Sequence, residues 1–115
     1  MRIPHLLGAV CCLASMSLTS TSAIAGSQTG LVTSAISATP DGKTIFSMTG
    51  THTSNPACST TSRWAFDNTT PSGQAVLSQV LSAISMGRTL QVVGTGACTN
   101  WADSEDARYV YIYNY

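Results

Sequence analysis

The chain has 115 residues, of which only 9% are charged, and its five basic residues balance five acidic ones. This balance leaves no basic patch of the kind that holds a phosphate backbone, so nucleic acid is not expected as a partner. The length suits one small domain, and four cysteines make the redox compartment the first question.

The N-terminal segment has the three parts of a secretory signal peptide. Arg2 and His5 form a charged start, and an apolar run continues to Leu18. Ala23-Ile24-Ala25 then supplies the small residues of an A-x-A cleavage site. The apolar run is shorter than the about 20 residues that a membrane-spanning helix needs.

Removal of this leader would leave a single domain. We expect a signal peptide over residues 1–25, cleaved after about Ala25, and one secreted or periplasmic domain over residues 26–115. A short N-terminal helix in the mature protein and a lipoprotein anchored at Cys11 are the alternatives. The domain would carry a formal charge of about −1. It has neither a second apolar span nor a basic amphipathic helix, so no membrane span is expected in the mature chain.

Two cysteines remain after the leader, Cys58 and Cys98. In an oxidising compartment such a pair is expected to form a disulfide, here closing a loop worth roughly 4 kcal/mol in the chain-entropy model. The alternative is a metal site, but zinc needs four closely spaced ligands and His52 is the only histidine after the leader. We therefore predict the disulfide, and neither a metal nor a cofactor.

Strand patterns and turns occupy the first half of the predicted domain. Gly30–Ala38, Lys43–Gly50 and Cys58–Phe66 are predicted as strands. Pro40-Asp41-Gly42 supplies the turn between the first two. One face of the third strand is expected to point inward, namely Cys58, Thr60, Ser62, Trp64 and Phe66.

Helical spacing replaces alternation after Thr70. Thr70 suits the N-cap, Pro71 the first helical position and Gly87 the left-handed position beyond the end, so we predict an amphipathic helix over about Pro71 to Met86. Its apolar residues recur at helical spacing and are expected to pack on a sheet: Val76, Leu77, Val80, Leu81 and Ile84.

Two more strands are predicted after the helix, Arg88–Gly94 and Ala107–Tyr115. In the last strand Val110 and Ile112 are expected to face the core. The element order β-β-β-α-β-β is that of an OB-fold, a five-stranded barrel with a helix between strands three and four. The predicted class is therefore α+β, mostly β, with one disulfide, and a small α+β roll is the alternative.

The tyrosines of the last strand are the candidate ligand-binding residues. Tyr109, Tyr111 and Tyr113 alternate with the core residues and are expected to form a ladder on the opposite face. Such rings combine a flat apolar face with a hydroxyl, which suits sugars and protein partners. Trp101 is added as a further candidate, and ordinary cross-strand pairing is the alternative role for the tyrosines.

The segment VVGTGACTNWADSED connects the last two strands. Gly94 and Gly96 permit a tight turn or a bulge. The acids Asp103, Glu105 and Asp106 are expected to form a solvated turn, with a calcium site from Asp103 and Glu105 as the alternative. No phosphate loop is expected, because neither a lysine nor a helix follows the glycines.

Four segments carry a family resemblance: PACSTTSRWAF, AISMGR, TLQVVGTGAC and NWADSED. Together they resemble a group of small secreted proteobacterial proteins and, more distantly, the B subunits of subtilase cytotoxin and typhoid toxin. The shared pattern covers about Ala57 to Val93. The resemblance implies an OB-fold, a homopentameric ring, binding of sialylated glycans and a separate catalytic subunit. It assigns no glycan-contacting residue to this chain.

The sequence therefore favours a secreted, non-catalytic binding module whose partner is a glycan or a protein. A homo-oligomer such as a pentamer belongs to this hypothesis. The alternative is a small disulfide-stapled periplasmic structural, protein-interaction or inhibitor protein. An enzyme is not expected, because no catalytic motif surrounds any serine and His52 is the only available histidine base.

Overall fold

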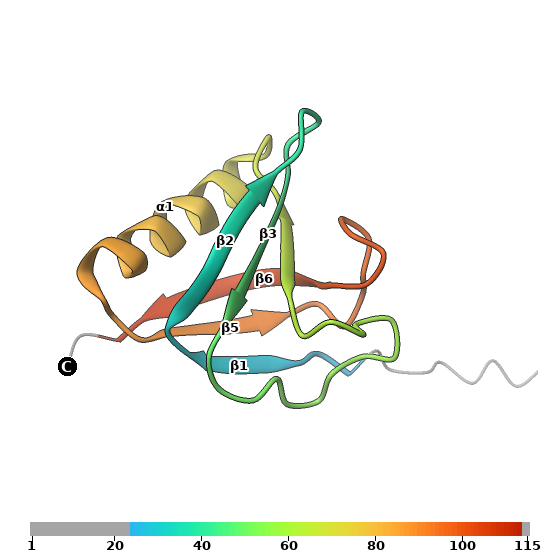
Figure 1. The fold of residues 1–115 in the computed structure, drawn as a ribbon. Helices are drawn as coiled ribbons and strands as arrows, with labels where there is room; N and C mark the ends of the chain where they lie inside the picture. The colour runs from blue at the N-terminus through green and yellow to red at the C-terminus, as the bar shows by residue number, and fades with distance from the viewer. Residues whose placement is uncertain (1–23, 114–115) are drawn as a thin grey trace, which may run out of the picture.

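The computed structural model describes residues 24–113, apart from the side chains of residues 34–37. Residues 1–23 of the predicted leader and residues 114–115 of the predicted last strand therefore lie outside the described part. Its strands are β1 Ser27–Gly30, β2 Val32–Ala38, β3 Lys43–Met48, β4 Trp64–Asp67, β5 Leu90–Gly94 and β6 Glu105–Ile112. Helix α1 spans Pro71–Met86 (Figure 1). No helix in the described part is long and apolar enough to cross a membrane.

The six strands form one sheet in the order β1-β5-β6-β4-β3-β2. Neighbours are antiparallel except for β4 and β6, which run parallel with Trp64 opposite Glu105. Strands β1 and β2 lie at the two ends of this order, yet only Leu31 separates them in the chain. One short stretch of chain therefore supplies both end strands of the sheet, as the corner in Figure 1 shows.

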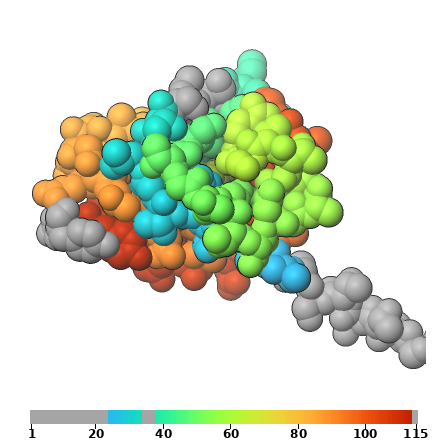
Figure 2. All heavy atoms as spheres, turned by 60° about the horizontal axis from the view of Figure 1, so that its bottom comes forward, coloured from blue at the N-terminus to red at the C-terminus, as the bar shows by residue number. Residues whose placement is uncertain are grey.

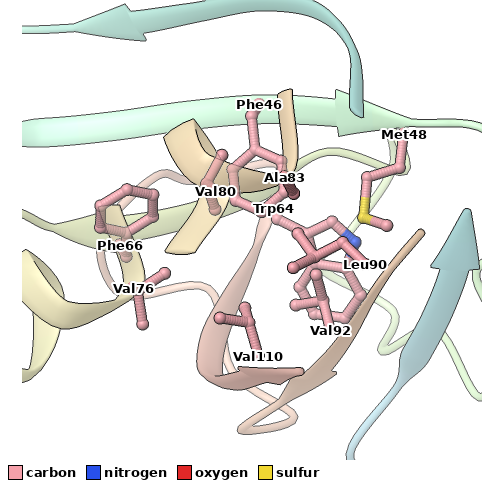
Figure 3. Packing of buried hydrophobic residues seen from close by; sticks show 10 residues of the cluster. All are labelled: Phe46, Met48, Trp64, Phe66, Val76, Val80, Ala83, Leu90, Val92 and Val110. Carbon is pink, nitrogen blue, oxygen red and sulfur yellow. The ribbon is translucent and has the colours of Figure 1, made fainter. Parts of the chain in front are cut away.

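The hydrophobic core lies between α1 and the sheet (Figure 3). Trp64 is fully buried at its centre, and the rings of Phe46 and Phe66 meet edge to face with centroids 6.1 Å apart. The inward residues of β5 and β6 and of the helix complete it: Val76, Val80, Ala83, Leu90, Val92 and Val110. Burial of this apolar surface fixes the helix on the sheet.

The predicted helix is confirmed together with both of its caps. The Thr70 hydroxyl accepts a hydrogen bond from the Gly73 N–H at 3.0 Å, and Pro71 occupies the first turn. Gly87 adopts the left-handed conformation at φ 62° and ends the helix.

The apolar face of α1 is narrower than predicted. Val76, Val80 and Ala83 are buried, whereas Leu81 and Ile84 are 48% and 46% exposed. The helix packs through one row of small and β-branched residues, so the neighbouring row contacts solvent. The prediction that Leu81 and Ile84 pack on the sheet was therefore wrong.

Two predicted strands differ from the structure in more than their end residues, and the last strand begins at Glu105 instead of Ala107. The strand predicted over Gly30–Ala38 is divided at Leu31 into β1 and β2, which gives six strands instead of five. The strand predicted from Cys58 begins only at Trp64. The cause lies at Ser62, whose φ of 54° is incompatible with a strand. Three of the residues predicted to face inward are exposed as a result: Cys58, Thr60 and Ser62.

The alternation of the last strand is confirmed over the residues that the structure describes. Val110 is buried and Ile112 packs against the core, whereas Tyr109 and Tyr111 are exposed. The ladder between β5 and β6 shifts register next to Gly94, in agreement with the predicted bulge. The α+β, mostly β class and the position of the helix in the element order are also confirmed.

Candidate functional site

The predicted disulfide is present between Cys58 and Cys98, with Cα atoms 6.1 Å apart. It joins the loop before β4 to the loop before β6, which are 40 residues apart in the chain. The same two loops are linked through Asp103, whose carbonyl oxygen accepts from the Thr60 N–H at 3.1 Å and from the Thr61 hydroxyl at 3.0 Å. The start of β6 is thus held from two sides.

The three acids at the start of β6 do not form a solvated turn. Glu105 and Asp106 are 0% and 5% exposed. Only Asp103 reaches the surface, where the Arg63 guanidinium donates to both of its oxygens at 2.9 and 3.0 Å. Burial opposes ionisation of Asp103, but hydrogen bonds from Ser104 and Arg63 prevail and lower its pKa.

The carboxylates also do not converge as a calcium site would require. Residues 24–113 contain no group of three or more His, Cys, Asp or Glu side chains placed to hold a metal ion. Glu105 and Asp106 point to opposite faces of β6 because they are neighbours in a strand. Each is bound by its own set of donors.

Glu105 lies in a pocket lined by glycines. Its Oε2 accepts from the backbone N–H groups of Gly26 and Gly96 at 2.9 and 3.0 Å. A Cβ at Gly94 would lie 1.8 Å from the same oxygen, so only glycine permits this approach. The other oxygen, Oε1, lies 2.8 Å from Nε2 of His52.

His52 continues the buried polar cluster. Its ring stacks on Trp64 with centroids 4.2 Å apart, and the Trp64 indole N–H donates to Gln28 at 2.9 Å. The side chains of His52 and Glu105 are 1% and 0% exposed, so a substrate cannot reach either. A role as a catalytic base is therefore not supported, and the cluster has a structural role.

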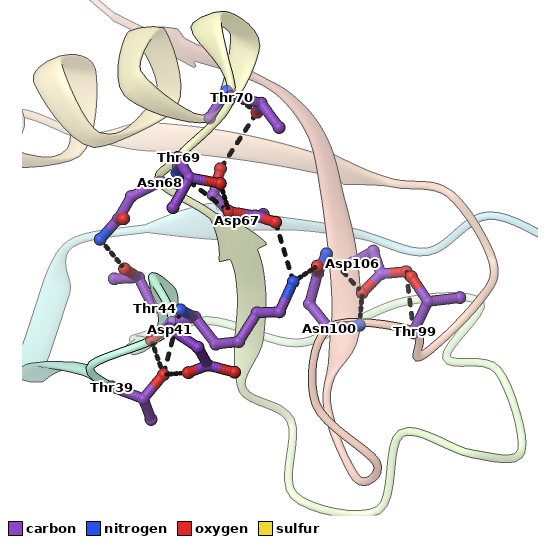
Figure 4. A network of polar contacts seen from close by, with 12 residues as sticks. Thr39, Asp41, Thr44, Asp67, Asn68, Thr69, Thr70, Thr99, Asn100 and Asp106 are labelled. Carbon is purple, nitrogen blue, oxygen red and sulfur yellow. Dashed lines mark hydrogen bonds and ion pairs between the residues drawn. The ribbon is translucent and has the colours of Figure 1, made fainter.

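A second polar network crosses the opposite face of β6 (Figure 4). Asp106 accepts from the backbone N–H groups of Thr99 and Asn100, both at 2.9 Å. The side-chain oxygen Oδ1 of Asn100 accepts from the Lys43 ammonium at 3.3 Å, and that ammonium also donates to Asp67 at 2.8 Å. The network links β3, β4 and the loop before β6.

The Lys43–Asp67 ion pair shifts the pKa of both residues. Donation from Lys43, and then from Thr69, holds the pKa of Asp67 well below its usual range. The same hydrogen bond with Asp67 raises the pKa of Lys43. Both groups therefore stay charged at neutral pH and form a fixed dipole beside the start of α1.

Two adjoining hollows lie between α1 and β6, with volumes of about 300 and 210 Å³. They share Ser72, Val76 and Arg108. We call them together the α1–β6 groove, which is lined by Phe66, Asp67, Thr70, Ser72, Gly73, Ala75, Val76, Gln79, Asn100, Ala107, Arg108, Tyr109 and Val110. The Asp67 carboxylate and the Asn100 amide thus lie at one end of the groove, and the Gln79 amide and the Tyr109 ring lie at the other.

The structure brings together only part of the predicted ligand-binding set. Tyr109 and Tyr111 meet edge to face with centroids 5.2 Å apart, but only Tyr109 lines the groove. The Tyr113 hydroxyl donates to Gln91 at 2.7 Å, in a cross-strand contact. Trp101 lies in the loop before β6, at the other end of that strand from Tyr111, and is half-buried.

Arg108 is the groove residue that the sequence analysis missed. It is exposed, and its side chain makes no hydrogen bond or ion pair with any residue of the described part. Its neighbour Ala107 pairs with Gly94 and its other neighbour Tyr109 pairs with Val93, so Arg108 occupies the bulge. The local signal was the glycine pair at 94 and 96, which predicted a bulge but not which side chain it would redirect.

Comparison of the chain with protein-family models, with curated proteins and with solved structures found no match. One guanidinium, one carboxylate, amides and hydroxyls lie along the wall of the α1–β6 groove beside an aromatic ring. Such a surface can contact a polar ligand that carries hydroxyls and a negative charge.

Proposed function

We propose that the protein is a secreted, non-catalytic binding module that takes an acidic glycan in the α1–β6 groove. The observation that carries the proposal is the position of Arg108, which lines both hollows and has no partner among residues 24–113. Tyr109 lies next to it on β6 and is 40% exposed. A free cation beside an accessible aromatic ring is a suitable pair of contacts for a charged sugar.

The chemistry of the groove divides between these two residues and the polar wall. A guanidinium binds a carboxylate through two parallel N–H donors, which fixes its orientation as well as its charge. The Tyr109 ring offers an apolar face to the C–H side of a pyranose. The hydroxyl of Ser72 and the amides of Gln79 and Asn100 remain for the sugar hydroxyls.

The OB-fold belongs to the same proposal, and two features support it. The helix lies between the third and fourth of the predicted strands. The strand before the helix, β4, pairs in parallel with the last strand, β6. The strand that is divided at Leu31 supplies both ends of the sheet, as the first strand of a closed barrel would. The resemblance to toxin B subunits, which bind sialylated glycans, agrees with an acidic ligand.

A homo-oligomer, such as a pentamer, is the second part of the proposal. Leu77, Leu81 and Ile84 follow one another at helical spacing, and the last two are about half exposed. Burial of this apolar row against a second copy would stabilise an assembly. A native mass above that of one chain would support the homo-oligomer. A monomer would contradict the pentameric assembly but would leave the groove proposal standing.

Binding of residues 26–115 to an array of neutral and sialylated glycans tests the function. We expect signal on sialylated glycans, and a loss of about tenfold or more in affinity for Arg108→Ala and for Tyr109→Ala. Tyr111→Ala is the control, because it removes an exposed ring of the same strand that does not line the groove. An equal loss of affinity for Tyr111→Ala would move the site to the face of β6 that carries the tyrosines. No binding by the unsubstituted protein would make a periplasmic interaction protein the better hypothesis.

A further inference from the structure

The chain enters the folded domain at one peptide bond, between Ala25 and Gly26. Ile24 is 68% exposed and Ala25 is also exposed, whereas Gly26 is buried. Figure 2 shows the first described residues, in blue, at the surface beside the loop of residues 51–63. Paired backbone hydrogen bonds of 3.0 and 2.8 Å between Ser27 and Thr53 hold the entering strand against this loop.

The Gly26 nitrogen points directly at the buried carboxylate. Its hydrogen bond to Glu105 Oε2 is 2.9 Å long and connects residues 79 apart in the sequence. No other side chain fits at this position, because a Cβ would lie 2.4 Å from Glu105 Oε1 and 2.6 Å from His52 Nε2. The glycine thus lets the nitrogen of residue 26 approach the carboxylate closely.

Glu105 lacks a permanent positive partner in the described chain. Its contacts are the two backbone N–H groups of Gly26 and Gly96 and the His52 ring, with no lysine or arginine among them. A fully buried carboxylate is costly unless it is paired and hydrogen-bonded. A positive charge within hydrogen-bond distance of Oε2 would remove most of that cost.

We propose that hydrolysis of the Ala25–Gly26 bond creates this charge, so that the α-ammonium of Gly26 forms a buried ion pair with Glu105. Water adds across the amide; Ala25 leaves with the carboxylate, and Gly26 keeps its nitrogen as an ammonium. The A-x-A residues at 23–25 place the cleavage at this bond. The nitrogen already lies 2.9 Å from the carboxylate, so no rearrangement is needed.

This ion pair makes removal of the leader a stabilising step for the fold. An ammonium offers three donors and a charge where the uncleaved amide offers one neutral donor. The precursor keeps Glu105 buried beside neutral backbone donors and is therefore the less stable species. This ion pair does not depend on the glycan proposal, because none of Gly26, His52 and Glu105 lines the α1–β6 groove.

The first test is the intact mass of the exported product of the full chain. We expect residues 26–115 with one disulfide, and any other N-terminus overturns the proposal. The second test compares this protein with a matched chain that starts one residue earlier, at Ala25. We expect the Gly26 chain to be more stable by about tenfold or more in the equilibrium constant for unfolding, and Glu105→Gln to abolish the difference.

A third measurement does not depend on the folding of the Glu105 variant. Acylation of the α-amine at neutral pH should be slow in the folded Gly26 chain and fast in the folded Ala25 chain. Both amines should react equally in urea, and the Lys43 amine, which is 28% exposed, serves as an internal reference in each sample. Equal stability and equal amine reactivity of the two folded chains would overturn the proposal.

Discussion

The two halves of strand β6 reverse the usual relation between residue type and burial. At its start Glu105 and Asp106 are carboxylates with 0% and 5% exposure. Farther along the same strand Tyr109 and Tyr111 are aromatic residues with 40% and 53% exposure. At these four positions burial follows the partners that the fold brings together, and not the hydrophobicity of each residue.

The difference has a physical cause on each side. The buried half lies among glycine backbones, loop amides and His52, which supply donors to nearly every carboxylate oxygen. The exposed half begins at Arg108, where the bulge interrupts the ladder, and the rings of Tyr109 and Tyr111 contact each other at the surface. The contacts of the first half of β6 indicate a structural role, and the exposed second half is where we propose that ligand binds.

Loss of the disulfide should have the largest effect and should act on the buried half. The double variant Cys58→Ser/Cys98→Ser releases a link across 40 residues, which is worth about 4 kcal/mol of unfolding free energy. Urea denaturation of the variant, and of the native protein with and without reductant, measures it. An unchanged midpoint would mean that the loops before β4 and β6 are held by their hydrogen bonds alone.

Removal of the Glu105 charge should be the next largest effect. Glu105→Gln keeps the shape but weakens the charge-assisted hydrogen bonds at a fully buried site, so we expect a loss of about 2–3 kcal/mol in unfolding free energy. Asp103→Asn is the matched control on the same strand end, and its exposed pair with Arg63 should matter much less. Equal losses for the two variants would contradict the distinction between buried and surface acids.

The tyrosines should show the opposite behaviour. Tyr109→Ala and Tyr111→Ala each remove the ring contact between these two neighbours on the same face of β6, so we expect losses of less than about 1 kcal/mol in stability with the fold intact. Circular dichroism and thermal unfolding of the two variants check this. Failure of either variant to fold would show that the exposed half is also structural and that its pairing role is the main one.

The smallest expected effect is a pH dependence from Asp67. Its pKa is lower in the folded chain than in the unfolded chain, so its contribution to stability is complete above about pH 4 and is lost as the pH falls toward the folded pKa. Asp67→Asn should therefore flatten the fall of the melting temperature in acid. A variant with the same acid dependence as the native protein would show that the Lys43 pair contributes nothing to stability.

Local features of this fold could be predicted from the sequence. The helix and both caps depend on residues within one turn of its ends, such as Thr70 and Gly87. The alternation of Val110 with Tyr109 and Tyr111 is likewise local. The disulfide could be predicted because only two cysteines follow the predicted leader.

The remaining features depend on contacts between distant residues. Nothing near Glu105 indicates that Gly26 and His52, which are 79 and 53 residues away, would enclose it. The strand predicted from Cys58 failed because the left-handed Ser62 is held beside residues that bond to Asp103, about forty positions along the chain. Arg108 could not be predicted as a groove residue, because the direction of its side chain depends on a bulge that forms only when β5 and β6 pair.

A titration of isotopically labelled residues 26–115 with sialyllactose, followed by amide NMR, tests the division of β6 most directly. The account predicts saturable shifts at Arg108, Tyr109 and the facing residues of α1 such as Ser72, with little change at Gly26 and Gly96 around Glu105. Shifts that centre on the Glu105 pocket, or no shifts at Arg108 and Tyr109, would contradict it.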